Sequence, residues 1–282
     1  MPIFLPSTST LCKRWLRAQL LYCFSLHLGT CVVTGQDATR CNFNGTDDKA
    51  IARCALRYVK PKAHLGATLA SLPEPLDALV GQESVDILPN LKTYLAKKKI
   101  AVGEVGGELT PIADVRFFII HDTSTPNYKD KEFPADIDSG TWSGNDLKKT
   151  KAVAHIFVNR IGESISGHNF NVPWRATKFE SSDAKWKGKF VHVELIQPRR
   201  SGPGPKDNDF VAPMPGFTAV QLDRLALLYI VASARRGHWL IPGFHCAVDA
   251  GLPDGHDDPQ NFDLPDWTTR LKALLGEVSA SK

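Results

Sequence analysis

An α/β fold, with a central sheet flanked by helices, is the fold class that the sequence predicts for residues 106–282. Apolar runs of strand length alternate in this region with helical segments that begin and end at typical capping residues. The chain has 282 residues, of which 43% are hydrophobic and 23% charged, as in a soluble globular protein. The composition therefore excludes disordered, collagen-like and polytopic membrane classes.

Residues 1–35 are typical of an export signal. Lys13, Arg14 and Arg17 precede an apolar stretch that runs from residue 20 to residue 33. This stretch is shorter than the roughly 20 apolar residues that span a bilayer, and its length suits the hydrophobic part of a signal peptide. We expect cleavage after residue 35, export to the periplasm or the cell exterior, and no transmembrane span in the mature chain.

The same segment allows two other interpretations. The apolar stretch could stay uncleaved as an amphipathic anchor. Residues 28–31, Leu-Gly-Thr-Cys, also loosely resemble a lipoprotein cleavage box ending at Cys31, although Thr is a poor residue directly before that cysteine.

The formal net charge of +4 comes mostly from this segment. Three of the 34 basic residues lie in residues 1–35, which contain no acid, so bases and the 30 acids nearly balance in the rest of the chain. A nucleic-acid-binding surface needs a clustered basic excess in the folded part. We therefore expect no nucleic-acid partner.

Residues 36–105 are expected to form a small N-terminal region of unknown role. Apolar residues between 51 and 58 repeat with helical spacing. In an oxidising compartment Cys41 and Cys54 are the natural disulfide pair, closing a loop of about 14 residues worth on the order of 3 kcal/mol. Cys246 is then left over. On a strand after His245 it would face away from that residue, and we expect a small buried thiol.

Three segments between residues 110 and 200 are predicted to contain strands. Residues 115–122, VRFFIIHD, form an apolar run that ends in a polar pair, as expected of a buried strand whose carboxyl end opens on a site. Residues 152–159 and 160–165 read as two strands joined at a turn near Gly162. Residues 189–196 alternate, which places His192 and Glu194 on the same face.

The clearest helix begins at a capping box of Thr218 and Gln221 and ends at Gly237, after two arginines. A last helix is expected at residues 264–275, and the segment 239–244 between the two is β-like. The Pro/Gly-rich stretch at 197–209 is expected to be a loop with Arg199 and Arg200 on its surface.

Side chains that can bind a metal ion lie at three places in the sequence where polar residues are not expected from the apolar pattern around them. His121 ends the apolar run, His245 follows the β-like segment, and His256, Asp257 and Asp258 lie thirteen residues or fewer beyond His245. Two imidazoles and one carboxylate leave a fourth position for water, which is the arrangement of catalytic rather than structural zinc. The chain contains nine His, so spacing alone only suggests such a site.

Three other histidines have simpler interpretations. His155 lies inside an apolar strand and is expected to be a core residue. His168 and His192 are expected at the surface or beside the site, and not as metal ligands.

Five segments follow one another along residues 110–276: FFIIHDTS, AHIFVNRIGE, VHVELIQ, a helix with TAVQL, and PGFHCAVDAG…DDPQNFD. This ordered set resembles the zinc N-acetylmuramoyl-L-alanine amidases of the amidase type 2 family, relatives of the peptidoglycan recognition proteins. The resemblance implies a mixed central β-sheet flanked by helices, Zn²⁺ as the cofactor, and peptidoglycan or a muropeptide as the substrate.

The resemblance implies His121, His245 and Asp258 as the zinc ligands. The family's third ligand is an Asp or Cys directly before a Pro, which favours Asp258 over the competing Asp257. Glu194 in VHVEL occupies the Glu position of the family strand written IGIEL. A carboxylate there can take a proton from the attacking water and deliver it to the leaving amine.

Several positions depart from the family pattern. Phe244 precedes His245 where the family usually has Gly. Asp122 follows His121 where many members have His or Tyr, and is expected to hold His121 by accepting a hydrogen bond. His256 replaces a Lys two residues before the third ligand and is expected to stabilise the oxyanion.

A fourth departure is the family's WHAG segment, which is not recognisable. The segment FNVPWRATKFE lies in about that place. It offers Trp174, Arg175 and Lys178 as residues that could bind a glycan face or a peptide carboxylate.

These residues predict an exported zinc amidase that cleaves the amide between the lactyl group of N-acetylmuramic acid and L-alanine. The departures favour a rival class, a binding module that grips muropeptide without hydrolysing it, and zinc content would discriminate between the two. A secreted antibacterial toxin with the same chemistry is a third hypothesis. Stem-peptide preference and oligomeric state cannot be derived from the sequence.

Overall fold

The computed structural model describes residues 40–57, 59–60, 64–84, 87–112, 114–202 and 210–281. The expected export signal at residues 1–35 lies outside the described residues, as do Tyr58 and the loop residues 203–209. Among the helices of the described ranges, none has the length and apolar character needed to cross a bilayer.

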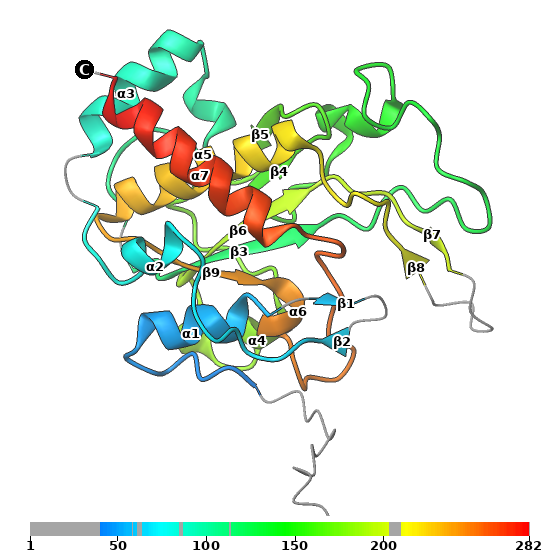
Figure 1. Cartoon of the computed structure of the whole chain (residues 1–282), viewed down its shortest axis with the longest axis horizontal. Coiled ribbons are helices and arrows are strands. Elements are labelled where there is room, and N and C mark those ends of the chain that lie inside the picture. The colour runs from blue at the N-terminus through cyan, green and yellow to red at the C-terminus, as the bar shows by residue number, and fades with distance from the viewer. Residues whose placement is uncertain are drawn as a thin grey trace, which may run out of the picture. The chain divides into compact units, whose positions relative to one another are not determined.

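A mixed sheet of five strands, in the order β5-β4-β6-β3-β9, forms the centre of the fold (Figure 1). The central strand β3 (Phe117–Asp122) pairs in parallel with β6 (Phe190–Leu195) and with β9 (Ile241–Phe244). On its other side β6 pairs in parallel with β4 (Ile156–Val158), and the edge strand β5 (Ser164–Ser166) runs antiparallel to β4. The predicted fold class, α/β with a mixed central sheet, is confirmed.

Helices cover both faces of this sheet (Figure 1). One face carries α3 (Ile87–Lys98), α5 (Ala219–Arg236) and α7 (Leu264–Ser279), which pack on one another. The other face carries α1 (Asp48–Ala55), α4 (Lys178–Ser181) and α6 (His245–Val248), of which α1 and α6 contact β9. The remaining helices and strands are short: α2 (Leu76–Leu79), β1 (Val59–Lys60), β2 (His64–Leu65), β7 (Arg200–Ser201), β8 (Phe210–Val211), and the 3₁₀ turns Val102–Glu104, Ser143–Asn145, Leu147–Lys149 and Ala184–Trp186.

All six residues of β3 are buried, because strands flank it on both sides and helices cover both of its faces. The predicted capping box of α5 is confirmed: Thr218 Oγ1 accepts from the Gln221 N–H at 3.2 Å, and Gln221 Oε1 accepts from the Thr218 N–H at 3.1 Å. The helix ends at Gly237, whose φ of 76° is costly for any residue with a Cβ.

The observed elements differ from the predicted ones mainly at their ends. The strand predicted at residues 152–159 is confined to β4, and its hairpin partner lies at 164–166 instead of 160–165. The reason is the turn between them, where the Asn159 N–H donates to Glu163 O and Gly162 has a φ of 81°. The last helix, predicted to end at 275, continues to Ser279.

The predicted Cys41–Cys54 disulfide is present and ties the N-terminal segment to α1. This helix packs on β9 at Gly243, where a Cβ would lie 2.8 Å from the Cβ of Ala55. Glycine at 243 therefore permits the close approach of α1 to the strand that leads to His245.

One local prediction in this region is wrong. The chain turns into α6 directly after β9, so Cys246 is helical and does not lie on a strand. It is nevertheless a buried free thiol, as predicted.

Candidate metal centre

The parallel strands bring His121, Glu194 and His245 to one edge of the sheet. His121 lies near the carboxyl end of β3 and is directly opposite Glu194 on β6. His245 follows the last residue of β9, the other neighbour of β3. The carboxyl ends of parallel strands are where open α/β sheets bind their ligands, because the strand order leaves a crevice there.

His121, His245 and Asp258 form a buried group that could hold a metal ion. The two Nδ1 atoms are 2.9 Å apart, His245 Nδ1 is 3.0 Å from Asp258 Oδ1, and His121 Nδ1 is 3.7 Å from Asp258 Oδ2. Ligand atoms at the usual bond lengths in a tetrahedral zinc site are about 3.3 Å apart, within the range of these distances. Asp258 is fixed by the Asp122 N–H, which donates to its Oδ2 at 3.1 Å.

The electrostatics of the group suit a bound cation. Burial and the neighbouring imidazoles lower the pKa of His121 well below its usual value, so its ring is neutral and has a lone pair available. Burial alone would lower the pKa of His245, but Asp258 and Asp249 raise it to about 10. Carboxylates that stabilise a proton on His245 also stabilise a metal cation in the same place.

Each of the two histidines also uses its Nε2. His121 Nε2 is hydrogen-bonded to His192 Nδ1 at 3.0 Å, and His245 Nε2 lies 3.0 Å from Asp249 Oδ2. Ligand histidines usually engage their second nitrogen in this way. Asp249 was not predicted from the sequence, whereas His192 was expected either at the surface or beside the site, and the second of these positions is observed.

Glu194 lies beside the group, and one of its carboxylate oxygens has no hydrogen-bond partner among the described residues. Its Oε1 is 4.0 Å from His121 Nδ1, and its Oε2 is buried with no hydrogen-bond partner among the described residues. Burial, followed by the charges of Asp258 and Asp122, raises the pKa of Glu194 well above its usual value. The side chain lines a pocket of about 540 Å³.

That pocket extends away from Glu194 between the segment after β3 and residues 143–153. Thr123, Lys149, Thr150 and Val153 line its walls. It therefore combines apolar surface with hydroxyl and ammonium groups, as expected of a site that binds a polar organic substrate.

His256 and Asp257 take different positions. The His256 ring stacks on His245 with centroids 4.3 Å apart, and its Nδ1 is 3.5 Å from Asp258 Oδ1. The ring is half exposed, so it faces the open side of the group. Asp257 instead accepts a hydrogen bond from the Gln260 amide, which leaves Asp258 as the carboxylate of the group.

Asp122 does not hold His121, contrary to prediction. Its carboxylate accepts from Arg199 Nη2 at 2.7 Å, from the Gln260 N–H at 3.0 Å and from the Ser124 N–H at 2.8 Å. Arg199 is correspondingly 1% exposed and not at a loop surface as predicted. This ion pair joins the end of β3 to the segment that follows β6, whereas the Gln260 N–H joins it to the loop that carries Asp258.

The segment in place of WHAG lies near the pocket without lining it. Trp174 stacks on His168 and donates through Nε1 to the carbonyl of Val153, a residue of the pocket wall. Arg175 is exposed. Lys178 contacts the carbonyl of Pro253. His155, predicted to be a core residue, is 1% exposed.

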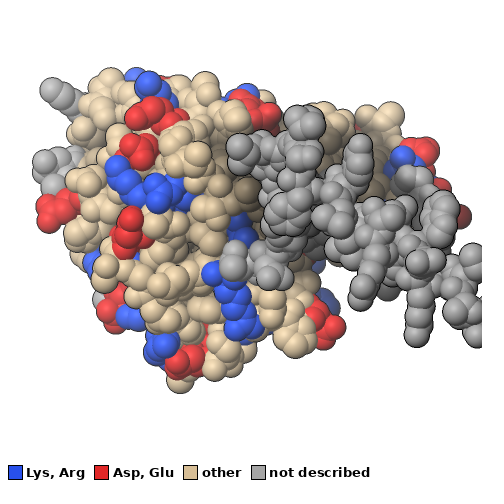
Figure 2. Space-filling view, turned by 60° about the horizontal axis from the view of Figure 1, so that its bottom comes forward, with Lys and Arg blue, Asp and Glu red and all other residues tan. Residues whose placement is uncertain are grey.

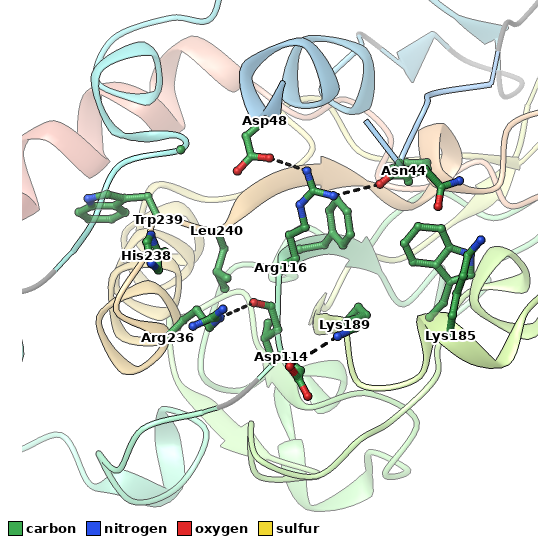
Figure 3. A pocket seen from close by; sticks show the side chains of 15 residues that line it. Asn44, Asp48, Asp114, Arg116, Lys185, Lys189, Arg236, His238, Trp239 and Leu240 are labelled. Atoms are coloured by element: carbon green, nitrogen blue, oxygen red, sulfur yellow. Dashed lines mark hydrogen bonds and ion pairs between the residues drawn. The ribbon is translucent and has the colours of Figure 1, made fainter. Parts of the chain in front are cut away.

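A second pocket, of about 560 Å³, lies at the opposite edge of the sheet (Figure 3). Arg116 precedes β3 there and pairs with Asp48 of α1 at 2.5 Å. Lys189 lies 3.6 Å from Asp114, and Arg236 donates to the carbonyl of Val115 (Figure 3). Two of the basic groups of this pocket, Arg116 and Lys189, are thus paired with acids, and Arg236 is bound by a backbone carbonyl.

On the face seen in Figure 2, basic and acidic side chains of the described residues are interspersed and do not gather by sign. Comparisons with family models, curated proteins and solved structures gave no match to this chain.

Proposed function

We propose that the chain is a zinc-dependent N-acetylmuramoyl-L-alanine amidase that hydrolyses the amide bond between N-acetylmuramic acid and L-alanine. The observation that carries the proposal is the buried His121–His245–Asp258 group with the unpartnered carboxylate of Glu194 beside it. Two nitrogens and one carboxylate oxygen are donors that suit zinc and leave a coordination position open. The five-segment resemblance to amidases of type 2 supports the same reaction.

His121, His245 and Asp258 would hold the ion. When bound, zinc would supply Lewis-acid chemistry, polarising the scissile carbonyl and making water easier to deprotonate. Glu194 accepts the proton of the attacking water and returns it to the leaving amine, and its raised pKa makes it a stronger base than an exposed glutamate. His256, on the open side of the group, donates a hydrogen bond to the carbonyl oxygen as its negative charge develops.

The location of the substrate supports the assignment. Peptidoglycan lies outside the cytoplasmic membrane, and the Cys41–Cys54 disulfide is of the kind that persists in an oxidising compartment. The basic residues and the apolar stretch that follows them in residues 1–35 agree with export to that compartment.

Mass spectrometry of digestion products tests the proposal directly. Purified protein with zinc is incubated with intact sacculi, and we expect stem peptides with free L-alanine amino termini beside intact glycan strands. The Glu194→Gln variant, which keeps all three ligands, should release them about 10²–10⁴-fold more slowly. Binding to sacculi without release of peptides by the wild-type protein would identify a binding module instead, and products cut at another bond would also overturn the amidase.

A further inference from the structure

One branch of contacts leads from His121 to the short helix α4. His121 Nε2 lies 3.0 Å from His192 Nδ1, and His192 Nε2 lies 2.9 Å from Glu180 Oε2. Glu180 belongs to α4, and all three side chains are 1% exposed or less. A buried carboxylate thus stands two contacts behind the first metal-capable histidine.

A second branch reaches the same helical turn from His245. His245 Nε2 lies 3.0 Å from Asp249 Oδ2. The Asp249 carboxylate accepts hydrogen bonds from the Lys178 N–H at 3.2 Å and from the Phe179 N–H at 2.9 Å. These are the first two residues of α4, so one helical turn anchors the partners of both histidines.

The turn itself is fixed by a capping box. Thr177 Oγ1 accepts from the Glu180 N–H at 3.1 Å, and Glu180 Oε2 accepts from the Thr177 N–H at 3.2 Å. Most capping glutamates are solvated, whereas this one is fully buried and its Oε1 has no hydrogen-bond partner among the described residues. Burial of a charge is costly unless the charge is paired, and the contact with His192 provides a partner for the Glu180 carboxylate.

The direction of the hydrogen bonds follows from the two carboxylates. A carboxylate only accepts, so His245 Nε2 carries the hydrogen of its bond to Asp249. His192 Nε2 lies 2.9 Å from Glu180 Oε2 at ion-pair distance but outside hydrogen-bond geometry, and a hydrogen on it makes this contact favourable. His192 then has its Nδ1 free to accept from His121 Nε2–H. The nitrogen that remains for a metal ion is therefore Nδ1 in both His121 and His245, and these two atoms lie 2.9 Å apart, as coordination of one ion requires.

We propose that α4 is a clamp for the metal centre, in which Glu180, acting through His192, and Asp249 are positioning residues for the two ligand histidines. The family strand written IGIEL has Gly at the position of His192, so this link belongs to the present chain and not to the family pattern. The clamp rests on the metal centre of the proposed function and makes no use of the reaction.

Zinc affinity, measured by competition with a chromogenic chelator, tests the clamp. Glu180→Gln keeps an oxygen for the Thr177 N–H but loses the charge that faces His192, and we expect 10–100-fold weaker zinc binding. Glu104→Gln is the matched control. Glu104 also accepts a backbone N–H three residues before it, that of Ala101, but its side chain pairs with Arg224, so the affinity should not change.

A second pair of variants separates hydrogen bonding from packing. His192→Gln retains one acceptor and one donor near the ring nitrogens and should bind zinc nearly as tightly as the wild-type protein. His192→Leu has neither and should bind 10–100-fold more weakly. The visible absorption of the Co²⁺-substituted protein should change in His192→Leu and in Glu180→Gln, because the orientation of a ligand ring changes its spectrum.

The outcomes distinguish the clamp from the amidase. Equal zinc affinity of Glu180→Gln and Glu104→Gln would overturn the clamp while leaving the metal centre intact, and a wild-type protein that binds no zinc would overturn both. The expected losses of affinity in a protein that cleaves no peptidoglycan would support the clamp and reject the amidase. Urea unfolding in EDTA shows whether Glu180→Gln folds. If it does not fold, the zinc affinity of Asp249→Asn tests the clamp through His245 instead.

Discussion

The two ends of β3 carry pockets of nearly equal size, about 560 Å³ at the amino end and about 540 Å³ at the carboxyl end. At the amino end the Arg116 guanidinium has several partners: it donates to the carbonyls of Phe43 and Gly45 and forms an ion pair with Asp48. At the carboxyl end Glu194 Oε2 lacks a partner among the described residues. Volume therefore does not distinguish the two pockets, whereas the buried carboxylate oxygen without a partner does, since burying such an atom is costly.

The largest loss of zinc binding and activity is expected from a substitution at the carboxyl end of β3. His245→Ala removes one of three donors, so we expect zinc content to fall from about one per chain to near zero and peptide release to fall to background. Asp48→Asn at the amino end should leave both unchanged. Metal analysis by mass spectrometry and product release from sacculi measure the two quantities, and undiminished zinc in His245→Ala would reject the ligand assignment.

Glu194→Gln should separate metal binding from turnover. The variant keeps all three ligands, so zinc content should stay at the wild-type level, whereas loss of the base should lower kcat by about 10²–10⁴-fold. Because burial disfavours the ionised carboxyl group, the neutral amide should also make the metal-free protein at least as stable as the wild-type protein. A variant with kcat within a few-fold of the wild-type value would show that another group moves the proton.

Arg116→Met tests whether the pocket at the amino end serves stability and not activity. Removal of the guanidinium leaves two carbonyls and the Asp48 carboxylate without their donor, and we expect a loss of about 1–3 kcal/mol in the free energy of unfolding. Activity per folded molecule should remain within about two-fold, because the change lies at the opposite end of the strand. Urea unfolding and kcat/KM measure the two, and a large loss of kcat/KM with unchanged stability would assign the amino-end pocket a role in the reaction.

The sequence predicted the parts of the site that carry a local signature. A strand buried on both faces is an uninterrupted apolar run, so the polar residue at its end, His121, was conspicuous. Asp258 was favoured over Asp257 only through the resemblance to amidases of type 2, in which the third ligand directly precedes a proline. The fold class followed from the same alternation of apolar runs and capped helices, although strand ends were displaced where the turn at Gly162 was longer than expected.

The contacts that the sequence did not predict depend on long-range register. His192 meets His121 only because β3 pairs with β6 in a particular register. Asp249 lies four residues after His245, a spacing that brings side chains together on a helix, whereas residue 246 was expected on a strand. Arg199 is buried in an ion pair with Asp122, which is 77 residues away in the sequence, so no local pattern predicts its burial.

His155 contrasts with His121 in its partners, which are backbone groups, whereas those of His121 are the side chains of two other histidines. His155 Nδ1 accepts from the His192 N–H at 3.1 Å, and its Nε2 faces the carbonyl of Val172 at 3.0 Å. Burial, followed by the neighbouring His192, lowers the pKa of His155 from 6.5 to about 3. Between these values the unfolded chain binds the proton more readily than the folded chain, so stability falls as the pH falls from 6.5 towards 3.

The slope due to this one group is at most about 1.4 kcal/mol per pH unit, and it vanishes above pH 6.5. His155→Asn keeps an oxygen that can accept from the His192 N–H but does not titrate. Urea unfolding in EDTA excludes any contribution from metal release. The stability difference between wild-type protein and variant should therefore be constant from pH 7 to 8 and should shrink as the pH falls below 6.5. Parallel stability curves down to pH 4 would contradict the assignment of His155 as a buried neutral histidine.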